Sequence, residues 1–243
     1  MNDFIEIVEK GEIYTIIFNR VEKRNALNRA MLAEIDEAID NCRVRVMIFE
    51  GKGGHFCSGL DLHQALDEGL VDILGELFEK IYNLPVVTIA SVQGSVMAAG
   101  IGIVAACDVA IAQEDSRFAF PEVRRGLIPA LVFHLLSNQM STRALQELFL
   151  SGREFSSKEA WRLGLIHHMV SAANKNEFME RLVDQFLKGG IEAQMRIKSM
   201  MRRKHPFSLQ EALSQHINAR NSLEAAEGIK AFEEKRLPRW KRP

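Results

Sequence analysis

Two segments combine very small residues with the end of an apolar stretch, where a chain can present bare backbone to a ligand. In FCSGLDL, residues 56–62, Ser58 and Gly59 form a predicted tight turn directly after an apolar strand. In GSVMAAGIG, residues 94–102, small side chains surround a predicted helix start. Backbone N–H groups at a turn and at a helix N-terminus can stabilise negative charge that develops on a carbonyl oxygen. Small residues would equally allow close helix packing, so the pattern alone leaves both interpretations open.

The elements that must position these segments follow from the hydrophobic periodicity. Residues 5–19 alternate around Gly11 and predict a two-stranded hairpin, and residues 25–42 have helical spacing with Asn25 or Asn28 as the N-cap. Further strands are expected over residues 45–51, 86–94 and 108–113, with helices between them. Alternating strands and helices indicate an α/β fold with crossover connections, whose ligands bind at the carboxyl ends of the strands. From about Leu131 onward the pattern predicts helices.

Composition excludes several classes of protein. The chain has 243 residues and a formal net charge of −1, which argues against general nucleic-acid binding. Its three cysteines, Cys42, Cys57 and Cys107, are odd in number and lack CxxC spacing, so we expect neither a disulfide framework nor a zinc site, and no metal. No apolar run reaches the ~18 residues that span a bilayer, and the acidic start is typical of neither a signal nor a transit peptide. We therefore expect a cytoplasmic protein that does not bind membranes.

Six segments, in order, resemble the crotonase (enoyl-CoA hydratase/isomerase) superfamily over nearly the whole chain. They are similar to the family's first loop–helix motif, its two oxyanion segments, its catalytic-glutamate loop, the helical turn that follows and its C-terminal signature. In that order they are NRVEKRNALN, HFCSGLDL, VQGSVMAAGIGIVAACDVAIA, FAFPEVRRGLIP, SGREFSSKEAWRLGLIHHMV and EGIKAFEEKRLPRW. The resemblance implies a spiral core of ββα and βαβ turns over residues 1–190 and a helical trimerisation segment over residues 191–243. It also implies a homotrimer or a dimer of trimers.

The same resemblance implies the substrate and the residues that hold it. The substrate would be an acyl thioester on the phosphopantetheine arm of CoA or of an acyl carrier protein, with no further cofactor. The backbone N–H groups of Leu60 and Ala99 would hold the thioester oxygen of an enolate, and Glu122 would be the acid-base group. The implied substrate-binding residues are Lys23, Arg24, Ala26, Ser58, Gly59, Asp61, Leu62, Gly100, Leu131, His134 and Tyr82.

One carboxylate of the family pattern is missing. Hydratases of the family carry two glutamates that position water, and in this chain the first of these positions is Gly102, while the second is Glu122. Hydration with two acids is therefore in doubt. Glu122 lies between a proline and a valine, so burial is expected to raise its pKa toward the range of a general acid-base. The alternative is a surface glutamate paired with Arg124 or Arg125.

Three functions are compatible with one carboxylate and an oxyanion hole. The first is dehydration of a 3-hydroxyacyl thioester, as in the polyketide β-branching dehydratases that act on 3-hydroxy-3-methylglutaryl carried by acyl carrier protein. The segments around Gly102, VVTIASVQG and GLIPALVF favour this interpretation. The second is Δ3,Δ2-enoyl-CoA isomerisation, with the glutamate moving a proton between C4 and C2. The third is a crotonase-like scaffold that has lost catalysis.

Four of the implied binding residues also have ordinary structural interpretations. His134 would orient a polar acyl group, but a single histidine is more often a packed or surface residue. Tyr82 would reach the pocket with its hydroxyl or pack in the core. Lys23 and Arg24 suit the phosphate of the carrier arm, and solvation explains their charge equally well.

Overall fold

The chain divides into two units, residues Met1–Phe178 and Met179–Pro243, and the boundary falls inside a helix. The structure is a computed structural model that describes residues 4–64, 67–203 and 205–241. The expected domain boundary after residue 190 stays a prediction.

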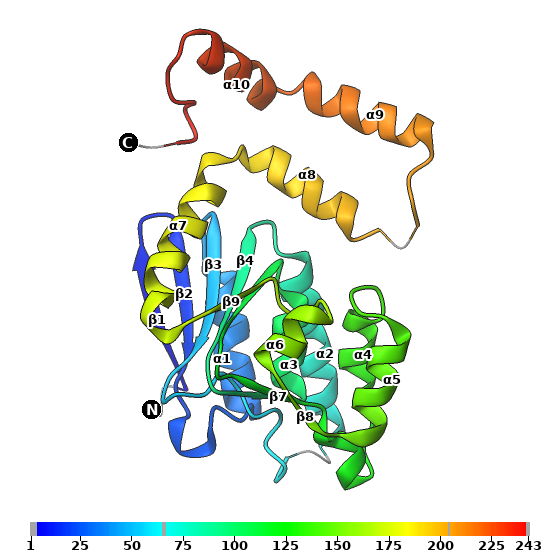
Figure 1. Cartoon of the computed structure of the whole chain (residues 1–243). Coiled ribbons are helices and arrows are strands. Elements are labelled where there is room, and N and C mark those ends of the chain that lie inside the picture. Colours follow the sequence, from blue (N-terminus) through cyan, green and yellow to red (C-terminus); the bar gives the residue numbers. More distant parts are fainter. Residues whose placement is uncertain (1–3, 65–66, 204, 242–243) are drawn as a thin grey trace. The chain divides into compact units, whose positions relative to one another are not determined.

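A six-stranded sheet is the main sheet of the first unit (Figure 1). Its strands, in spatial order, are β1 (Ile5–Lys10), β2 (Ile13–Phe18), β3 (Val46–Gly51), β4 (Val87–Val92), β6 (Val109–Gln113) and β9 (His168–Val170). The predicted hairpin is confirmed: β1 and β2 are antiparallel, and Gly11 between them has a positive φ of 61°. All other neighbouring pairs are parallel. Every residue of β4 is buried, as expected for a central strand of a parallel sheet.

A smaller sheet holds the two small-residue segments side by side. It contains β5 (Ser95–Met97), β7 (Arg117–Ala119) and β8 (Glu154–Ser156), in the order β5-β7-β8. β5 is parallel to β7, and β7 is antiparallel to β8. Cys57, from the first segment, forms a parallel bridge with Val96 of β5. The segment after β3 and the segment after β4 therefore meet at one edge of this sheet.

Helices connect and cover the strands. They are α1 (Arg29–Asp40), α2 (Glu68–Asn83), α3 (Ala99–Ala106), α4 (Ala130–Leu136), α5 (Thr142–Ser151), α6 (Ser157–Arg162) and α7 (Lys175–Lys188), which spans the boundary between the units. Short 3-10 turns are η1 (Val21–Lys23), η2 (Pro121–Arg125) and η3 (Ala172–Asn174). α1 packs beside α2, α2 beside α3 and α3 beside α4. All eight residues of α3 are buried, which only small and apolar side chains permit.

The start of α1 resolves the choice between two predicted caps. The side chain of Asn28 accepts a hydrogen bond from Met31 N at 2.8 Å, so Asn28 is the N-cap. Asn25 has a different task, because its side-chain amide donates to the carbonyls of Lys52 and His55 at 2.9 and 2.8 Å. That side chain ties the loop before α1 to the segment after β3.

The predicted α/β spiral is confirmed, but the expectation of helices alone after Leu131 is wrong. The short strands β8 and β9 interrupt this part of the chain. Each has three residues, and three residues are too few for an apolar-polar alternation to stand out from a helical pattern.

The second unit contains α8 (Ile191–Met201), α9 (Leu209–Arg220) and α10 (Leu223–Glu233). The Glu224 carboxylate accepts hydrogen bonds from Glu192 N at 2.9 Å and Ala193 N at 2.8 Å, so α10 caps the first turn of α8. A capping box of Ser208 and Glu211 begins α9. Further along, α9 exposes an apolar face at every fourth residue: Leu209, Leu213 and Ile217.

Candidate active site

A cavity of about 580 Å³ opens in the first unit and contains most of the residues singled out from the sequence. Its lining comes from the loop before α1, the segment after β3, one face of α2, the start of α3, η2 and the start of α4. Ten predicted site residues line it: Lys23, Arg24, Ala26, Ser58, Leu60, Asp61, Leu62, Ala99, Glu122 and Leu131.

The peptide unit that carries the Leu60 N–H is fixed from one side. Leu27 N donates to Gly59 O at 2.8 Å, and Asp61 N donates to Leu27 O at 2.8 Å. The C=O and N–H of a trans peptide point in opposite directions, so a Gly59 carbonyl turned toward Leu27 turns the Leu60 N–H away from it. Within the described part of the chain this N–H has no acceptor. The Leu60 N–H is therefore free for a ligand in the cavity.

The Ala99 N–H is fixed in a similar way by α3. Ala98 O accepts hydrogen bonds from Ile101 N at 2.9 Å and Gly102 N at 3.3 Å, so this carbonyl points into the helix. The Ala99 N–H then points out of the helix N-terminus, where the helix dipole favours negative charge. Ala98 has a positive φ of 49°, a conformation that costs a non-glycine residue about 1–3 kcal/mol. The strained residue, Ala98, directly precedes the Ala99 N–H group.

Two glycines let these segments approach one another. A Cβ at Gly100 would lie 2.6 Å from Cys57 O and 2.9 Å from Cys57 Cβ. Gly59 has a positive φ of 99°, and a Cβ on it would lie 2.9 Å from Ala98 Cβ. Neither glycine lines the cavity, so their place in the site is to bring the two backbone donors together. Close packing and anion binding, the two interpretations of the small residues, are therefore compatible here.

Glu122 lies in η2 with its carboxylate turned inward. Its Oε2 atom is buried and has no hydrogen-bond partner in the structure. Burial raises the pKa of Glu122, while its own backbone N–H and the charge of Arg125 oppose the rise. Arg124 Nε donates to Ser151 O at 3.5 Å and Arg125 Nη1 to Pro121 O at 3.2 Å. The structure contains no ion pair of Glu122 with either arginine.

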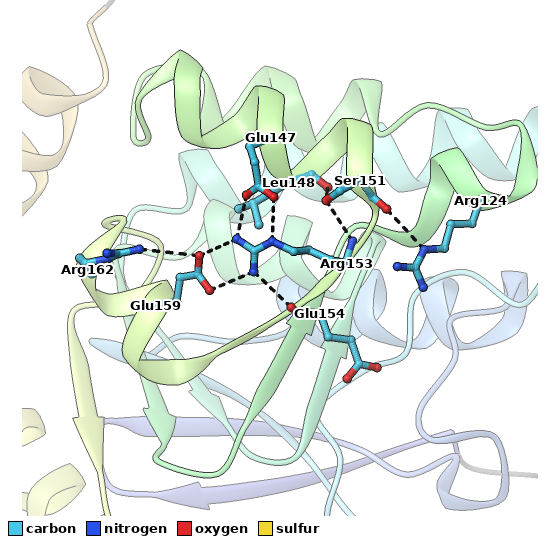
Figure 2. Close-up of polar contacts among 8 residues, drawn as sticks. All are labelled: Arg124, Glu147, Leu148, Ser151, Arg153, Glu154, Glu159 and Arg162. Carbon is cyan, nitrogen blue, oxygen red and sulfur yellow. Dashed lines mark hydrogen bonds and ion pairs between the residues drawn. The ribbon is translucent and has the colours of Figure 1, made fainter.

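A cluster around Arg153 joins α5, β8 and α6 through polar contacts (Figure 2). The Arg153 guanidinium donates to both carboxylate oxygens of Glu147 in α5, at 2.7 Å each, and to both of Glu159 in α6, at 3.0 and 2.6 Å. Arg153 Nη1 also donates to the backbone carbonyl of Glu154 in β8 at 3.3 Å. Because η2 packs against the end of α5, the cluster supports the loop that carries Glu122.

The polar mouth of the cavity is built from the loop before α1. Ser58 N donates to Arg24 O at 3.0 Å and Ser58 Oγ to Lys23 O at 3.1 Å, so the backbone of both residues is held next to the first small-residue segment. Asp61 also lines the cavity, but Arg20 Nη1 binds its Oδ2 at 2.7 Å. Partial burial alone would raise the pKa of Asp61, and its bond to Arg20 lowers it instead. Asp61 is therefore a charged carboxylate held in an ion pair with Arg20.

Besides Gly59 and Gly100, two further predicted residues lie outside the cavity lining. His134 is exposed, and its Nε2 lies 3.0 Å from Glu79 Oε1 on the neighbouring helix α2. Tyr82 packs against the hydrophobic core at the end of α2. The structure thus places both in the ordinary environments that the sequence left open, and brings neither to Glu122.

Several lining residues were not singled out from the sequence. Val71, Leu74 and Phe78 come from one face of α2, and Leu127 and Ile128 from the loop before α4. The spacing of the α2 residues, three and four apart, predicts a shared face, but nothing local shows that this face borders a cavity rather than the core. They make part of the cavity wall apolar.

The described residues contain no group of three or more His, Cys, Asp or Glu side chains that could hold a metal ion. None of the helices they form is both long and apolar enough to cross a membrane. Burial raises the pKa of the Cys57 thiol to about 12, so Cys57 remains a neutral packing residue.

Comparisons with known proteins agree with this geometry. Enoyl-CoA hydratase domain-containing protein 3, mitochondrial, of Danio rerio is 33% identical over 258 residues, which cover 96% of this chain and 86% of that protein. Carnitinyl-CoA dehydratase of Proteus mirabilis is 29% identical over 264 residues, 99% of each chain. The crystal structure of an enoyl-CoA hydratase from Mycobacterium smegmatis matches with a TM-score of 0.90 and 28% identity, covering 98% of this chain and 99% of that one.

The model of one protein family, described as enoyl-CoA hydratase/isomerase, matches residues 8–243. Together with the crotonase-type fold and the two small-residue segments that meet beside Glu122, this match shows that the chain belongs to the enoyl-CoA hydratase/isomerase (crotonase) family.

Proposed function

We propose that this protein dehydrates a 3-hydroxyacyl thioester, with Glu122 as the only acid-base side chain and the N–H groups of Leu60 and Ala99 as the oxyanion hole. One observation carries the proposal. The Oε2 atom of Glu122 is buried and has no hydrogen-bond partner, and Glu122 lines the same cavity as two backbone donors that lack acceptors among the described residues. A buried carboxylate oxygen without a partner is costly unless function requires it.

The reaction follows from these groups. The thioester oxygen accepts hydrogen bonds from Leu60 N and Ala99 N, and the Glu122 carboxylate removes the proton from C2. The electron pair of that C–H bond forms an enolate whose charge the two N–H groups stabilise. Protonated Glu122 then gives its proton to the C3 hydroxyl, the C3–O bond breaks, and C2=C3 forms as water leaves. Glu122 ends as a carboxylate, so one group serves as base and then as acid.

We propose 3-hydroxy-3-methylglutaryl on an acyl carrier protein as the substrate, as part of polyketide β-branching. A second cavity of about 310 Å³ shares Met97, Pro121 and Arg125 with the first, and Arg124 also lines it. Two guanidinium groups beside the Glu122 loop suit the distal carboxylate of a glutaryl chain. Lys23 and Arg24, at the mouth of the larger cavity, suit the phosphate of the carrier arm. A CoA thioester presents the same arm and is the alternative carrier.

We further propose that the protein assembles as a homotrimer or a dimer of trimers through its C-terminal helices. The exposed apolar face of α9, with Leu209, Leu213 and Ile217, supports this proposal. Contiguous exposed apolar surface of this kind is typical of protein interfaces.

Isomerisation of a Δ3-enoyl-CoA is the second candidate, and a specific observation favours it. Asp61 and Glu122 are the carboxylates in the described lining, and Asp61 is paired with Arg20. A single free carboxylate beside an apolar wall is what transfer of a proton between C4 and C2 requires.

Mass spectrometry and absorbance of the purified protein's products distinguish these functions. Loss of one water from 3-hydroxy-3-methylglutaryl carrier protein supports dehydration. Conversion of a 3-enoyl-CoA to the conjugated 2-enoyl-CoA without a mass change would replace it with isomerisation. If neither substrate reacts, the scaffold interpretation gains, and dehydration is rejected.

Glu122→Gln tests the assigned base in the same assay. We expect turnover to fall by at least ~100-fold while the melting temperature stays near that of the wild type. The control is Glu79→Gln, since Glu79 is an exposed glutamate bound to His134 outside the cavity. Equal activity of the Glu122 variant and the wild type would remove Glu122 from the mechanism.

A further inference from the structure

The aromatic ring of Phe78 rests against the bare backbone of Gly102. Phe78 lies in α2, is almost fully buried and lines the larger cavity. A Cβ built on Gly102 would lie 2.2 Å from Phe78 Cζ and 2.5 Å from Phe78 Cε2. Carbon atoms do not approach this closely without a bond. The ring and any side chain at position 102 therefore exclude each other.

The ring lies close to the thioester site because of the geometry of α3. Gly102 follows Ala99 by three residues, so both positions share one face of the helix, about 4.5 Å apart along its axis. Side chains on a helix tilt toward its N-terminus, so the space in front of Gly102 faces the Ala99 N–H. Phe78 fills that space. If Ala99 holds the thioester carbonyl, this ring would border the acyl carbons that follow it.

The wall around Phe78 is apolar. Val71 and Leu74 continue the same face of α2, and Leu131 of α4 also lines the cavity. Leu131 packs close to α2, since a Cβ built on Gly75 would lie 3.6 Å from Leu131 Cδ2, an ordinary van der Waals contact. None of the four lining residues Val71, Leu74, Phe78 and Leu131 carries a charged group. It can select an acyl chain by shape and exclude water.

We propose that Phe78, seated on Gly102, is the specificity-determining residue that packs against the C3 substituent of the acyl chain and takes the place of a second acid-base side chain. The proposal rests on the proposed function, because it assumes a thioester carbonyl held by Leu60 and Ala99. Beyond the proposed function, it predicts a preference for acyl chains with a methyl group at C3. It also explains why residue 102 is a glycine, since a side chain there would meet the Phe78 ring.

Binding of saturated acyl-CoA thioesters tests this without any reaction. Isothermal titration calorimetry with butyryl-CoA and 3-methylbutyryl-CoA compares chains that differ by one methyl group at C3. We expect the wild type to bind 3-methylbutyryl-CoA about 10-fold more tightly. Phe78→Ala should reduce this ratio to about 1, because the methyl group loses its contact. Leu77→Ala is the matched control: Leu77 is buried in the same helix but does not line the cavity.

The outcomes separate this proposal from the proposed function. A wild type that shows the methyl preference but dehydrates nothing would refute the reaction and leave the role of Phe78 standing. An unchanged ratio in Phe78→Ala, or an equal loss in Leu77→Ala, would overturn the role of Phe78 whatever the reaction.

A second pair of variants tests the contact with Gly102. Gly102→Ala should lower the melting temperature of the wild type, since the new methyl group meets the ring. In the Phe78→Ala background the same change should raise the melting temperature, because alanine favours a helix more than glycine does. Equal effects of Gly102→Ala in both backgrounds would contradict the direct exclusion.

Discussion

At the scale of single residues, the important feature of Glu122 is a carboxylate oxygen without a hydrogen-bond partner. Its Oε2 is buried without a donor, and the nearby arginines bind backbone carbonyls instead. Burial therefore raises the pKa of Glu122, while its own backbone N–H and the charge of Arg125 oppose the rise. Such a group suits proton transfer near neutral pH better than an exposed glutamate does.

The pH dependence of dehydration tests this environment. Glu122 must be ionised to accept the C2 proton, so kcat/KM should be constant at high pH and fall as the pH drops through the raised pKa of Glu122. The midpoint should lie above 4.5, the ordinary value of a glutamate. Arg125→Met should move the midpoint to higher pH, because the positive charge that favours the carboxylate is gone.

Arg124→Met is the control for that shift, since Arg124 binds Ser151 O. The pH midpoint of kcat/KM in this variant should match that of the wild type, whatever the change in the size of kcat/KM. A midpoint unaffected by Arg125→Met, or moved equally by Arg124→Met, would contradict the assigned environment.

Glu122 and the two backbone donors could be proposed from the sequence because each lies in a short motif that resembles one of the crotonase family, and a short motif can be recognised locally. Their roles stay predictions. The contact between Phe78 and Gly102 could not be predicted, since the residues lie on different helices and only their packing reveals it. His134 shows the opposite error. It lies one turn beyond Leu131 in α4, but its side chain reaches Glu79 rather than the cavity.

At the scale of elements, the proposed oxyanion hole depends on how closely α3 approaches the segment after β3. Gly100 sets that distance, because its bare Cα faces Cys57 O. Neither donor can be changed by substituting its own side chain, since both are backbone groups. Changing the spacing tests them indirectly.

Gly100→Ala should displace α3 and lower kcat by about 100-fold or more, the usual cost of losing an oxyanion donor. Gly75→Ala is the control, because its Cβ would make only an ordinary contact with Leu131 in another helix. Steady-state kinetics and circular dichroism of both variants check the prediction. Wild-type kcat in a folded Gly100→Ala protein would contradict it.

The Arg153 cluster should stabilise the elements behind Glu122 in a pH-dependent way. Hydrogen bonds from Arg153 lower the pKa values of Glu147 and Glu159. A lowered carboxylate pKa contributes stability above the ordinary value, and this is lost as the pH falls through the lowered pKa. Arg153→Met should therefore reduce the urea midpoint at pH 7 and much less near pH 3.

Arg162→Met is the matched control, since Arg162 is highly exposed and lies 3.8 Å from Glu159. It should change the free energy of unfolding by less than about 1 kcal/mol. An Arg153→Met effect that is equal at both pH values would show that packing, not charge, explains the cluster.

At the scale of the whole molecule, much of the first unit could be predicted. The alternation around Gly11 and the spacing in α1 specify their elements locally, and the order of strands and helices indicates the α/β class. The three-residue strands β8 and β9 could not be predicted, because pairing with distant strands creates them. The cavity also depends on distant segments, which only the folded chain brings together.

The proposed trimer can be tested through α9. Light scattering coupled to size-exclusion chromatography should give three or six times the mass of one chain. Leu213→Glu, which puts a charge on the exposed apolar face, should shift the protein toward single chains. Ser214→Glu, on the same helix, is the control. A wild-type protein that elutes as a single chain would refute the assembly.

Exchange of the C2 proton tests the central claim most directly. In deuterated water, wild-type protein should introduce deuterium at C2 of butyryl-CoA, because Glu122 removes that proton while Leu60 and Ala99 hold the enolate oxygen. Glu122→Gln should exchange it at least ~100-fold more slowly, measured by mass spectrometry. Equal exchange by both proteins, or none by the folded wild type, would contradict the account.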